Sequence, residues 1–328
     1  MKEIKNTKKT NFLKKILIKI CRMFGFEIID QSSLSFPISN KNYEDSLSVP
    51  GEKSITLGLG ETLITRKVRS LDIVIKTCTS VQLVSQNKKR IFEEPKSEYT
   101  KRTINSLVNS AKDLKKKFEN IDVKFTIIDN KSSKPVIDKI LSKISSEGFK
   151  NSYVEVKKVE DKNNMSSTMA SIRESFNLVK DCEDLIYFVE DDYIHEKISL
   201  SEILYTYERL SSILGSDLIV CPTDYPYLYT QSENTKIFLG EKRHWRQIDQ
   251  TLCTLLTSNK IIQKYWNELT SMCKIEHYPF EKPLHNIYKK ELCISPVPSL
   301  AAHFTNINSI YGLSPNIDWK RLWDENEN

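Results

Sequence analysis

Three consecutive carboxylates follow an apolar run in the middle of the chain. The run Leu185–Val189 is typical of a buried strand, and Glu190, Asp191 and Asp192 come directly after it. Three anions packed at one point repel one another and lose hydration unless a cation neutralises them. Mg²⁺ and Mn²⁺ prefer such oxygen ligands and are bound by one or two carboxylates together with substrate phosphates. The pattern therefore predicts a metal and phosphate site, with a solvated acidic turn as the alternative.

The same residues resemble a known family. An apolar strand that ends in Glu190, Asp191 and Asp192 is similar to the DxD-type element of GT-A glycosyltransferases, especially the N-acetylglucosaminyltransferase I group. Residues 164–173, at the start of the helix before this strand, are similar to the family 2 layout. The resemblance extends over about residues 70–305. It implies transfer of a hexosyl or N-acetylhexosaminyl group from a nucleotide-sugar to a hydroxyl acceptor.

For the acidic cluster the resemblance implies specific roles. Asp192 would bind Mn²⁺ or Mg²⁺ directly, Asp191 would lie near the ribose or the metal, and Glu190 near the sugar or the ribose. His303 resembles a late histidine of the family that reaches the metal or the diphosphate, and a buried, hydrogen-bonded core histidine is the alternative. The metal would act as a Lewis acid that neutralises the departing diphosphate.

Further donor-binding residues follow from the same resemblance. Thr77 and Ser80 stand where the exit of the first strand contacts the nucleotide. Asp129, followed by Asn130, stands where an acid at the end of the second strand binds the nucleotide base. Arg173 is expected to support phosphate or base binding, and a solvent-facing helical arginine is the alternative.

The acceptor side is expected downstream of the three acids. Glu281 precedes a segment similar to the family's acid-containing helix start, which implies a general base for an inverting transfer. Lys282 follows where family 2 usually has a second acid, so Asp249 and Asp224 remain alternative bases. Trp245 is expected to stack on an acceptor sugar and Asp224 to line the same cleft, whereas an aromatic core anchor is the other interpretation of Trp245.

The elements that must position these residues alternate along the chain. Strands are predicted at residues 71–77, 121–128, 153–159 and 185–189, with helices at about 100–118, 135–145 and 166–179. Strand–helix–strand units of this length predict right-handed crossovers and a parallel sheet. Ligands bind beyond the carboxyl ends of such strands, where residues 77–80, 129–130 and 190–192 fall. The expected fold is α/β, a Rossmann-like GT-A fold with a mostly parallel sheet flanked by helices.

The N-terminal arm, residues 1–29, has a composition of its own. Residues 1–23 carry eight basic side chains and one acid, a net +7, and the rest of the chain carries a net −1. An apolar helical stripe runs from Phe12 to Phe24, with Gly25 as a C-cap. A basic amphipathic helix is typical of contact with an anionic membrane surface, and docking on the protein's own core is the alternative.

Composition sets the remaining expectations. We expect a connector at residues 30–66, a GT-A domain at residues 67–310 with a donor half (67–193) and an acceptor half (194–310), and a tail at residues 311–328. The seven cysteines contain no CxxC pair, which predicts neither a disulfide framework nor a zinc site. No apolar run approaches the ~20 residues of a membrane-spanning helix. A cytoplasmic protein is expected, and peripheral binding at the inner face of the membrane stays open.

Competing functions are a metal-dependent nucleotidyltransferase and a non-catalytic glycosyltransferase-like binding module. The first is disfavoured because residues 77–81 contain no glycine for a phosphate loop. The retained acids disfavour the second. A nucleic-acid partner is not expected, since the body of the chain is near neutral. The expected partners are a nucleotide-sugar donor and a saccharide or lipid-linked acceptor.

Overall fold

The structure is a computed structural model that describes residues 12–26, 47–56, 60–80, 90–156, 164–179, 182–230, 232, 234–274 and 280–327. Residues 1–11 and 27–29 of the predicted arm, and most of the predicted connector, lie outside the described residues. The chain divides into two compact units. The smaller consists of residues 1–67 and 208–216, and the larger of residues 68–207 and 217–328.

The smaller unit contains a helix and a hairpin. Helix α1 (Phe12–Met23) confirms the predicted helix, and the following Gly25 has the left-handed φ of +80° that favours glycine after a helix end. Strands β1 (Lys53–Thr56) and β2 (Gly60–Leu63) pair antiparallel. This hairpin lies within residues 30–66, where the sequence predicts no element, because strands of four residues are too short for alternation to be recognised.

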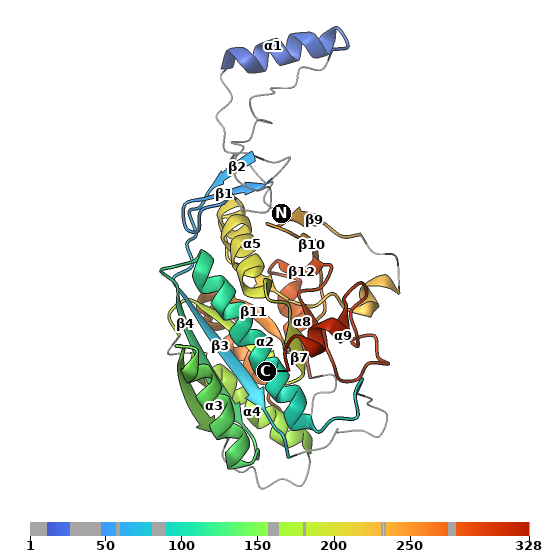
Figure 1. Cartoon of the computed structure of the whole chain (residues 1–328). Helices are drawn as coiled ribbons and strands as arrows, with labels where there is room; N and C mark the ends of the chain where they lie inside the picture. The colour runs from blue at the N-terminus through green and yellow to red at the C-terminus, as the bar shows by residue number, and fades with distance from the viewer. Residues whose placement is uncertain are drawn as a thin grey trace. The chain divides into compact units, whose positions relative to one another are not determined.

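Within the described residues the larger unit is built on a nine-stranded sheet (Figure 1). Its strands are β3 (Ser70–Thr77), β4 (Asp122–Asp129), β5 (Lys150–Glu155), β6 (Leu185–Glu190), β8 (Ile219–Val220), β9 (Ile237–Leu239), β10 (His244–Gln247), β11 (Leu255–Ser258) and β12 (Cys293–Val297). Their order across the sheet is β5-β4-β3-β6-β11-β8-β12-β10-β9. Strands β10 and β11 run against the others, which share one direction. The predicted α/β class with a mostly parallel sheet is confirmed.

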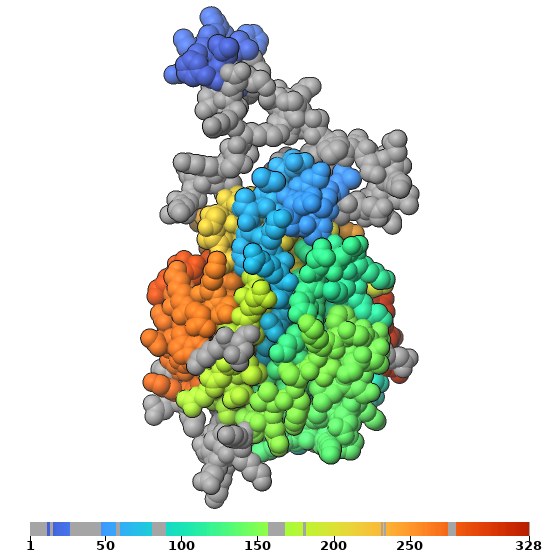
Figure 2. Space-filling view, turned by 90° about the vertical axis from the view of Figure 1, so that its left-hand side faces the viewer, coloured from blue at the N-terminus to red at the C-terminus, as the bar shows by residue number. Residues whose placement is uncertain are grey.

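Helices cover both faces of this sheet. They are α2 (Lys96–Lys117), α3 (Lys134–Ser146), α4 (Asn164–Leu178), α5 (Ser199–Leu214, which ends in the smaller unit), α6 (Asn259–Lys264), α7 (Trp266–Ser271), α8 (Lys282–Tyr288) and α9 (Trp319–Asp324). Helices α2 and α3 contact each other, and α4 contacts α7. The crossovers through α2 and α3 advance in one direction and the crossover through α4 returns, so right-handed connections place α4 on the opposite face. In Figure 2 the green residues of α2 and α3 lie on the right, and the orange residues of α6 and α7 lie on the left.

Most elements that the sequence predicts within residues 67–193 are confirmed, with different ends. Strand β5 begins at Lys150, earlier than the predicted residues 153–159, of which 157–159 lie outside the described residues. Its first residues are polar and lie at the edge of the sheet, so pairing with β4 fixes them and apolar patterning does not reveal them. The nearly continuous burial of β3 follows from its central position between β4 and β6.

A second, two-stranded sheet continues from the end of β6. Strand β7 (Tyr193–His195) pairs antiparallel with β13 (Ala301–His303). Beside it lies a buried cluster formed by Tyr99, Ile194, Ala302, Phe304, Leu322 and Trp323. Because α9 contributes Leu322 and Trp323, part of residues 311–328, which the sequence analysis separates as a tail, packs in the core of the larger unit.

Candidate functional site

The carboxyl ends of β3, β4 and β6 meet at one edge of the sheet. The register pairs Thr77 with Asp129 across β3 and β4, and Lys76 with Glu190 across β3 and β6. Ends of parallel strands are where open α/β sheets bind ligands. The structure therefore brings together the first group of residues that the sequence predicts for a donor site.

Beyond Glu190 the chain turns through the two aspartates into the second sheet. The backbone N–H of Phe304 donates to the carbonyl of Asp192 at 3.0 Å, and β13 places His303 opposite Tyr193. His303 thus lies beside Asp192, although 111 residues separate them in the sequence. Pairing of β7 with β13 brings this histidine to the acidic turn.

Each of the three carboxylates lies within 3.5 Å of a basic side chain. The pairs are Glu190 with Lys76 at 3.3 Å, Asp191 with Lys96 at 3.1 Å and Asp192 with His303 at 3.5 Å. From the sequence alone, a metal ion is expected to neutralise this turn. The structure supplies compensating charge from the protein itself, so the acidic cluster does not by itself require a bound metal.

Asp191 is the most enclosed of the three acids. It is 6% exposed, and its Oδ2 accepts hydrogen bonds from the backbone N–H of Cys78 at 3.0 Å and from the hydroxyl of Thr100 at 3.1 Å. Its Oδ1 faces the ammonium of Lys96. Burial raises the pKa of Asp191, while the attraction of Lys96 opposes the rise. Two neutral donors and one cation therefore share this carboxylate.

His303 has further partners besides Asp192, and they fix the orientation of its ring. The Nδ1 of His303 donates to the carbonyl of Tyr311 at 2.8 Å, and its ring stacks on Tyr193 with centroids 4.7 Å apart. Burial disfavours charge on both groups, but their mutual attraction prevails. It raises the pKa of His303 and holds the pKa of Asp192 well below its usual range. The imidazole is thus fixed with Nε2 toward Asp192.

Asp129 organises the loops at the end of β4. It is 1% exposed, and its two oxygens accept from the hydroxyl of Thr77 at 2.7 Å and from the backbone N–H of Ser132 at 2.9 Å. Asn130 donates its backbone N–H to the carbonyl of Thr77 at 2.9 Å. The carboxylate of Asp129 is therefore enclosed by these two donors, and its contact with a nucleotide base stays a prediction. Ser80 is exposed.

Trp245 lies in the interior, as the alternative interpretation of an aromatic core anchor expects. Its side chain is 0% exposed, and its indole N–H donates to Glu202 at 3.1 Å, so it anchors the core. Asp224 is likewise buried, with an ion pair to Arg246 and a hydrogen bond from the hydroxyl of Tyr229. Burial raises the pKa of Asp224, and these two partners oppose the rise. Both carboxylate oxygens therefore have a partner, and the roles of Asp224 as an acceptor contact and as an alternative base stay predictions.

The other two candidate bases both act electrostatically on Tyr311. Glu281 precedes α8 and is half-buried, whereas Asp249 is exposed. Burial raises the pKa of Tyr311, and the charges of Glu281 and Asp249 raise it further. The hydroxyl of Tyr311 donates to the side-chain oxygen of Gln250, the residue after Asp249, at 3.0 Å. The carbonyl of Tyr311 in turn holds His303. Tyr311 therefore connects the candidate bases with the acidic turn.

Of the remaining positions, Arg173 was predicted and two lysines were missed. Arg173 is exposed on α4 and lies beside Cys273, whose pKa burial raises to about 11 and Arg173 lowers in part. Among the described residues, no hydrogen bond or ion pair joins Arg173 to the three carboxylates. Lys76 could have been noticed as the one cation in an apolar strand. No pattern in the sequence distinguishes Lys96 from the many other lysines of the chain, although it begins helix α2.

The donor groups at the acidic turn determine which kind of metal site they can form. Among the described residues, no three or more His, Cys, Asp or Glu side chains are arranged to hold one. Asp192 and His303 give two neighbouring donors. Mg²⁺ and similar ions are often held by one or two protein ligands and completed by substrate phosphates. The residues present therefore fit an ion that is completed by a substrate, and not a fully protein-built metal centre.

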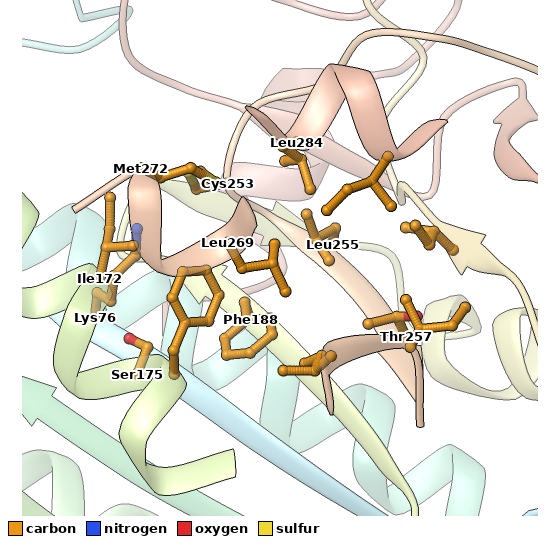
Figure 3. Close-up of a pocket in the computed structure, with 15 residues that line it drawn as sticks. Lys76, Ile172, Ser175, Phe188, Cys253, Leu255, Thr257, Leu269, Met272 and Leu284 are labelled. Carbon is orange, nitrogen blue, oxygen red and sulfur yellow. The ribbon is translucent and has the colours of Figure 1, made fainter. Parts of the chain in front are cut away.

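Two spaces lie away from these acids. Figure 3 shows apolar side chains such as Phe188, Leu255 and Leu269 around an interior space with a free volume of about 30 Å³. That is room for about one water molecule, which is far too little for a nucleotide. A larger groove, of about 300 Å³, lies between α2 and α3 and includes Lys101 and Lys139.

Comparisons with known proteins give a limited likeness. No family model and no curated protein matches the chain. Among solved structures, residues 1–349 of TarS from S. aureus match with a TM-score of 0.37 and 11% identity over 60% of this chain and 48% of that one. The galactosyltransferase LgtC in complex with donor and acceptor sugar analogs matches with a TM-score of 0.36 and 15% identity. The match covers 68% of this chain and 72% of that one. The glycosyltransferase GlyE of Streptococcus pneumoniae TIGR4 matches with a TM-score of 0.40 and 11% identity. The match covers 79% of this chain and 63% of that one. The chain thus spans about half of the matched TarS chain, and likeness at these scores assigns no activity.

Proposed function

We propose that the chain is a glycosyltransferase that moves a sugar from a nucleoside diphosphate sugar to a hydroxyl acceptor. The observation that carries the proposal is the meeting of Glu190, Asp191, Asp192 and His303 at the carboxyl edge of a mostly parallel sheet. An edge of this kind is where such sheets bind nucleotides. The strand that ends in three acids, with its resemblance to the DxD-type element, supports the same activity.

In this proposal the acidic turn binds the diphosphate end of the donor. Asp192 and His303 would hold Mn²⁺ or Mg²⁺ together with substrate phosphates, and the ion would neutralise charge on the leaving diphosphate. His303 keeps its Nε2 toward Asp192 because Tyr311 fixes its Nδ1. The enclosed Asp129 keeps the loops after β3 and β4 in place beside the donor.

The acceptor would approach from the side of Tyr311. The acceptor oxygen forms the new bond to the anomeric carbon, the bond from that carbon to the diphosphate oxygen breaks, and the acceptor proton passes to Glu281. Asp249 is the alternative base, since the charges of both carboxylates raise the pKa of Tyr311. A carboxylate on the face opposite the leaving group favours inversion of the sugar. The acceptor class that we propose is a saccharide, free or linked to a lipid.

We further propose that α1 binds an anionic membrane surface. Its apolar side chains are exposed, with Phe12 at 74%, Leu17 at 53% and Met23 at 80%. Residues 1–23 carry a net charge of +7, which complements anionic headgroups. No helix among the described residues is long and apolar enough to cross a membrane. An apolar helical stripe with lysines beside it is typical of a helix that lies in a membrane interface.

Vesicle co-sedimentation tests the membrane contact. The full chain should sediment with anionic vesicles, less so at high salt, and the double variant Leu17→Glu/Ile20→Glu should stay in solution. Ile237→Glu, which changes an equally exposed apolar residue (66%) on β9, is the matched control and should sediment like the wild type. Equal sedimentation of the wild type and the α1 variant would remove this part of the proposal.

The proposed activity is tested by donor binding followed by transfer. A thermal-shift screen of nucleotide-sugars, with and without Mn²⁺, should identify a donor, because a ligand that binds only the native state raises the melting temperature. With that donor, Glu281→Gln should retain binding and lower the transfer rate by a factor on the order of 10²–10⁴. Asp249→Asn is the matched control. Retained transfer in Glu281→Gln together with its loss in Asp249→Asn would move the base, and no shift with any donor would overturn the proposed function.

A further inference from the structure

Two lysines lie at the acidic turn, and they differ in access. The Lys96 side chain is 22% exposed and its partner Asp191 only 8%, so the ammonium lies on the open side of this pair. The Lys76 side chain is 11% exposed and also borders the small apolar space behind β6. Lys96 is therefore the cation that an incoming anion can reach.

Asp191 does not depend on Lys96 alone. Its Oδ2 keeps the backbone N–H of Cys78 and the hydroxyl of Thr100, while Lys96 faces Oδ1. If the ammonium turns away, two hydrogen bonds remain and Oδ1 becomes free for a hydroxyl donor of a ligand. The ion pair can therefore break while the buried carboxylate keeps two hydrogen-bond donors.

A nucleoside diphosphate offers both kinds of group that the opened pair requires. Its phosphate oxygens carry more negative charge than the one carboxylate that Lys96 faces, and charge-assisted hydrogen bonds to phosphate are strong. Its ribose hydroxyls can donate to Asp191. Burial lowers the pKa of Lys96, but the attraction of Asp191 and Asp192 raises it above its ordinary value, so the side chain remains an ammonium.

We propose that Lys96 is the diphosphate-binding residue of this site, paired with Asp191 in the free chain and transferred to phosphate oxygens when the nucleotide enters. The inference rests on the proposed function and adds a residue that neither the acidic motif nor its resemblance indicates. It also explains why a buried acidic turn carries a partly exposed lysine from the start of a different helix. Lys96 binds the leaving group whether or not a metal ion accompanies it.

Calorimetric titration of the full chain tests this role, with UDP, GDP, ADP and dTDP as probes, each with EDTA and with Mn²⁺. Lys96→Met should weaken binding of the preferred diphosphate about 10- to 100-fold under both conditions, the usual effect of losing a charge-assisted hydrogen bond. Lys96→Arg, which keeps the charge, should stay within a few fold of the wild type. Lys101→Met is the matched control, since Lys101 is 49% exposed and lies five residues further along α2.

A double variant separates binding from support of the fold. If Lys96 only neutralises Asp191, Lys96→Met/Asp191→Asn should restore both the melting temperature and diphosphate binding, which would overturn the proposal. We expect the melting temperature to recover while binding remains as weak as in Lys96→Met. Wild-type affinity in Lys96→Met would overturn the inference alone. A wild type that binds none of the four diphosphates would instead overturn the proposed function together with the inference.

Discussion

Glu202 and Asp191 are both buried carboxylates, exposed by 2% and 6%, but their partners differ in kind. The partners of Glu202 are neutral and fixed, namely the backbone N–H groups of Glu241, Lys242 and Arg243 at 3.2, 2.8 and 3.1 Å and the indole of Trp245 at 3.1 Å. Asp191 shares two neutral donors with the ammonium of Lys96, which ends a long, partly exposed side chain.

This difference distinguishes an acid that supports the fold from an acid at a binding site. Backbone donors cannot leave Glu202 without unfolding the turn at residues 241–243, so this carboxylate is committed to structure. A lysine can exchange one anion for another by a change of side-chain rotamers. Burial and charge alone do not separate the two cases, because burial raises the pKa of both acids.

The largest expected effect comes from removing the fixed acid. Glu202→Ala should lower the free energy of unfolding by about 3–5 kcal/mol, because several buried N–H donors lose their acceptor together. Urea denaturation measures the change. Glu119→Ala, at an exposed glutamate, should change stability by no more than about 0.5 kcal/mol. Equal effects of the two substitutions would contradict a structural role for Glu202.

A substitution at Gly240 tests the packing of the backbone against Trp245 and Glu202. A Cβ at this position would lie 2.3 Å from the indole nitrogen of Trp245 and 2.5 Å from Glu202 Oε1. Gly240→Ala should therefore displace the indole from the carboxylate and destabilise the chain by about 1–3 kcal/mol. Gly148→Ala is a weaker comparison, since it meets open space but has a φ of +81°. A neutral Gly240→Ala in thermal and urea denaturation would show that the turn can move away.

A lower pH should decrease the free energy of unfolding through His195, which lies on β7 directly after the acidic turn. Burial lowers the pKa of His195 to about 3 from its ordinary 6.5. Between these values the unfolded chain binds the additional proton, so stability falls as the pH falls. From pH 7 to pH 5 this group should remove about 2 kcal/mol from the free energy of unfolding. His195→Gln should lose less stability over this range, whereas His244→Gln, at an exposed histidine, should follow the wild type.

The smallest effect on stability is expected at the exchangeable acid. Asp191→Asn keeps the shape of the side chain and an acceptor for Cys78 and Thr100 while it removes a buried charge. The free energy of unfolding should change by less than about 1 kcal/mol, because the lost ion pair and the avoided desolvation offset each other. A loss comparable to that of Glu202→Ala, measured in the same urea series, would remove the distinction between the two acids.

Much of the donor half could be predicted from local patterns. Apolar runs gave β3, β4 and β6, and amphipathic spacing gave α2, α3 and α4. Short elements could not be predicted, since β7 and β13 have three residues each and are stabilised by pairing with each other. Trp245 illustrates the limit for single residues, because an aromatic side chain is equally suited to a cleft wall and to the core.

The sequence by itself determined that three acids leave a buried strand together, because five apolar residues directly before them require burial. It also determined the basic, amphipathic character of α1. Only the tertiary structure decided which cation faces which acid. Lys76 lies 114 residues from Glu190 in the sequence, and its position follows from the parallel register of β3 and β6. His303 arrives through the pairing of β13 with β7. Such contacts depend on the register between distant strands, which no local pattern of residue types encodes.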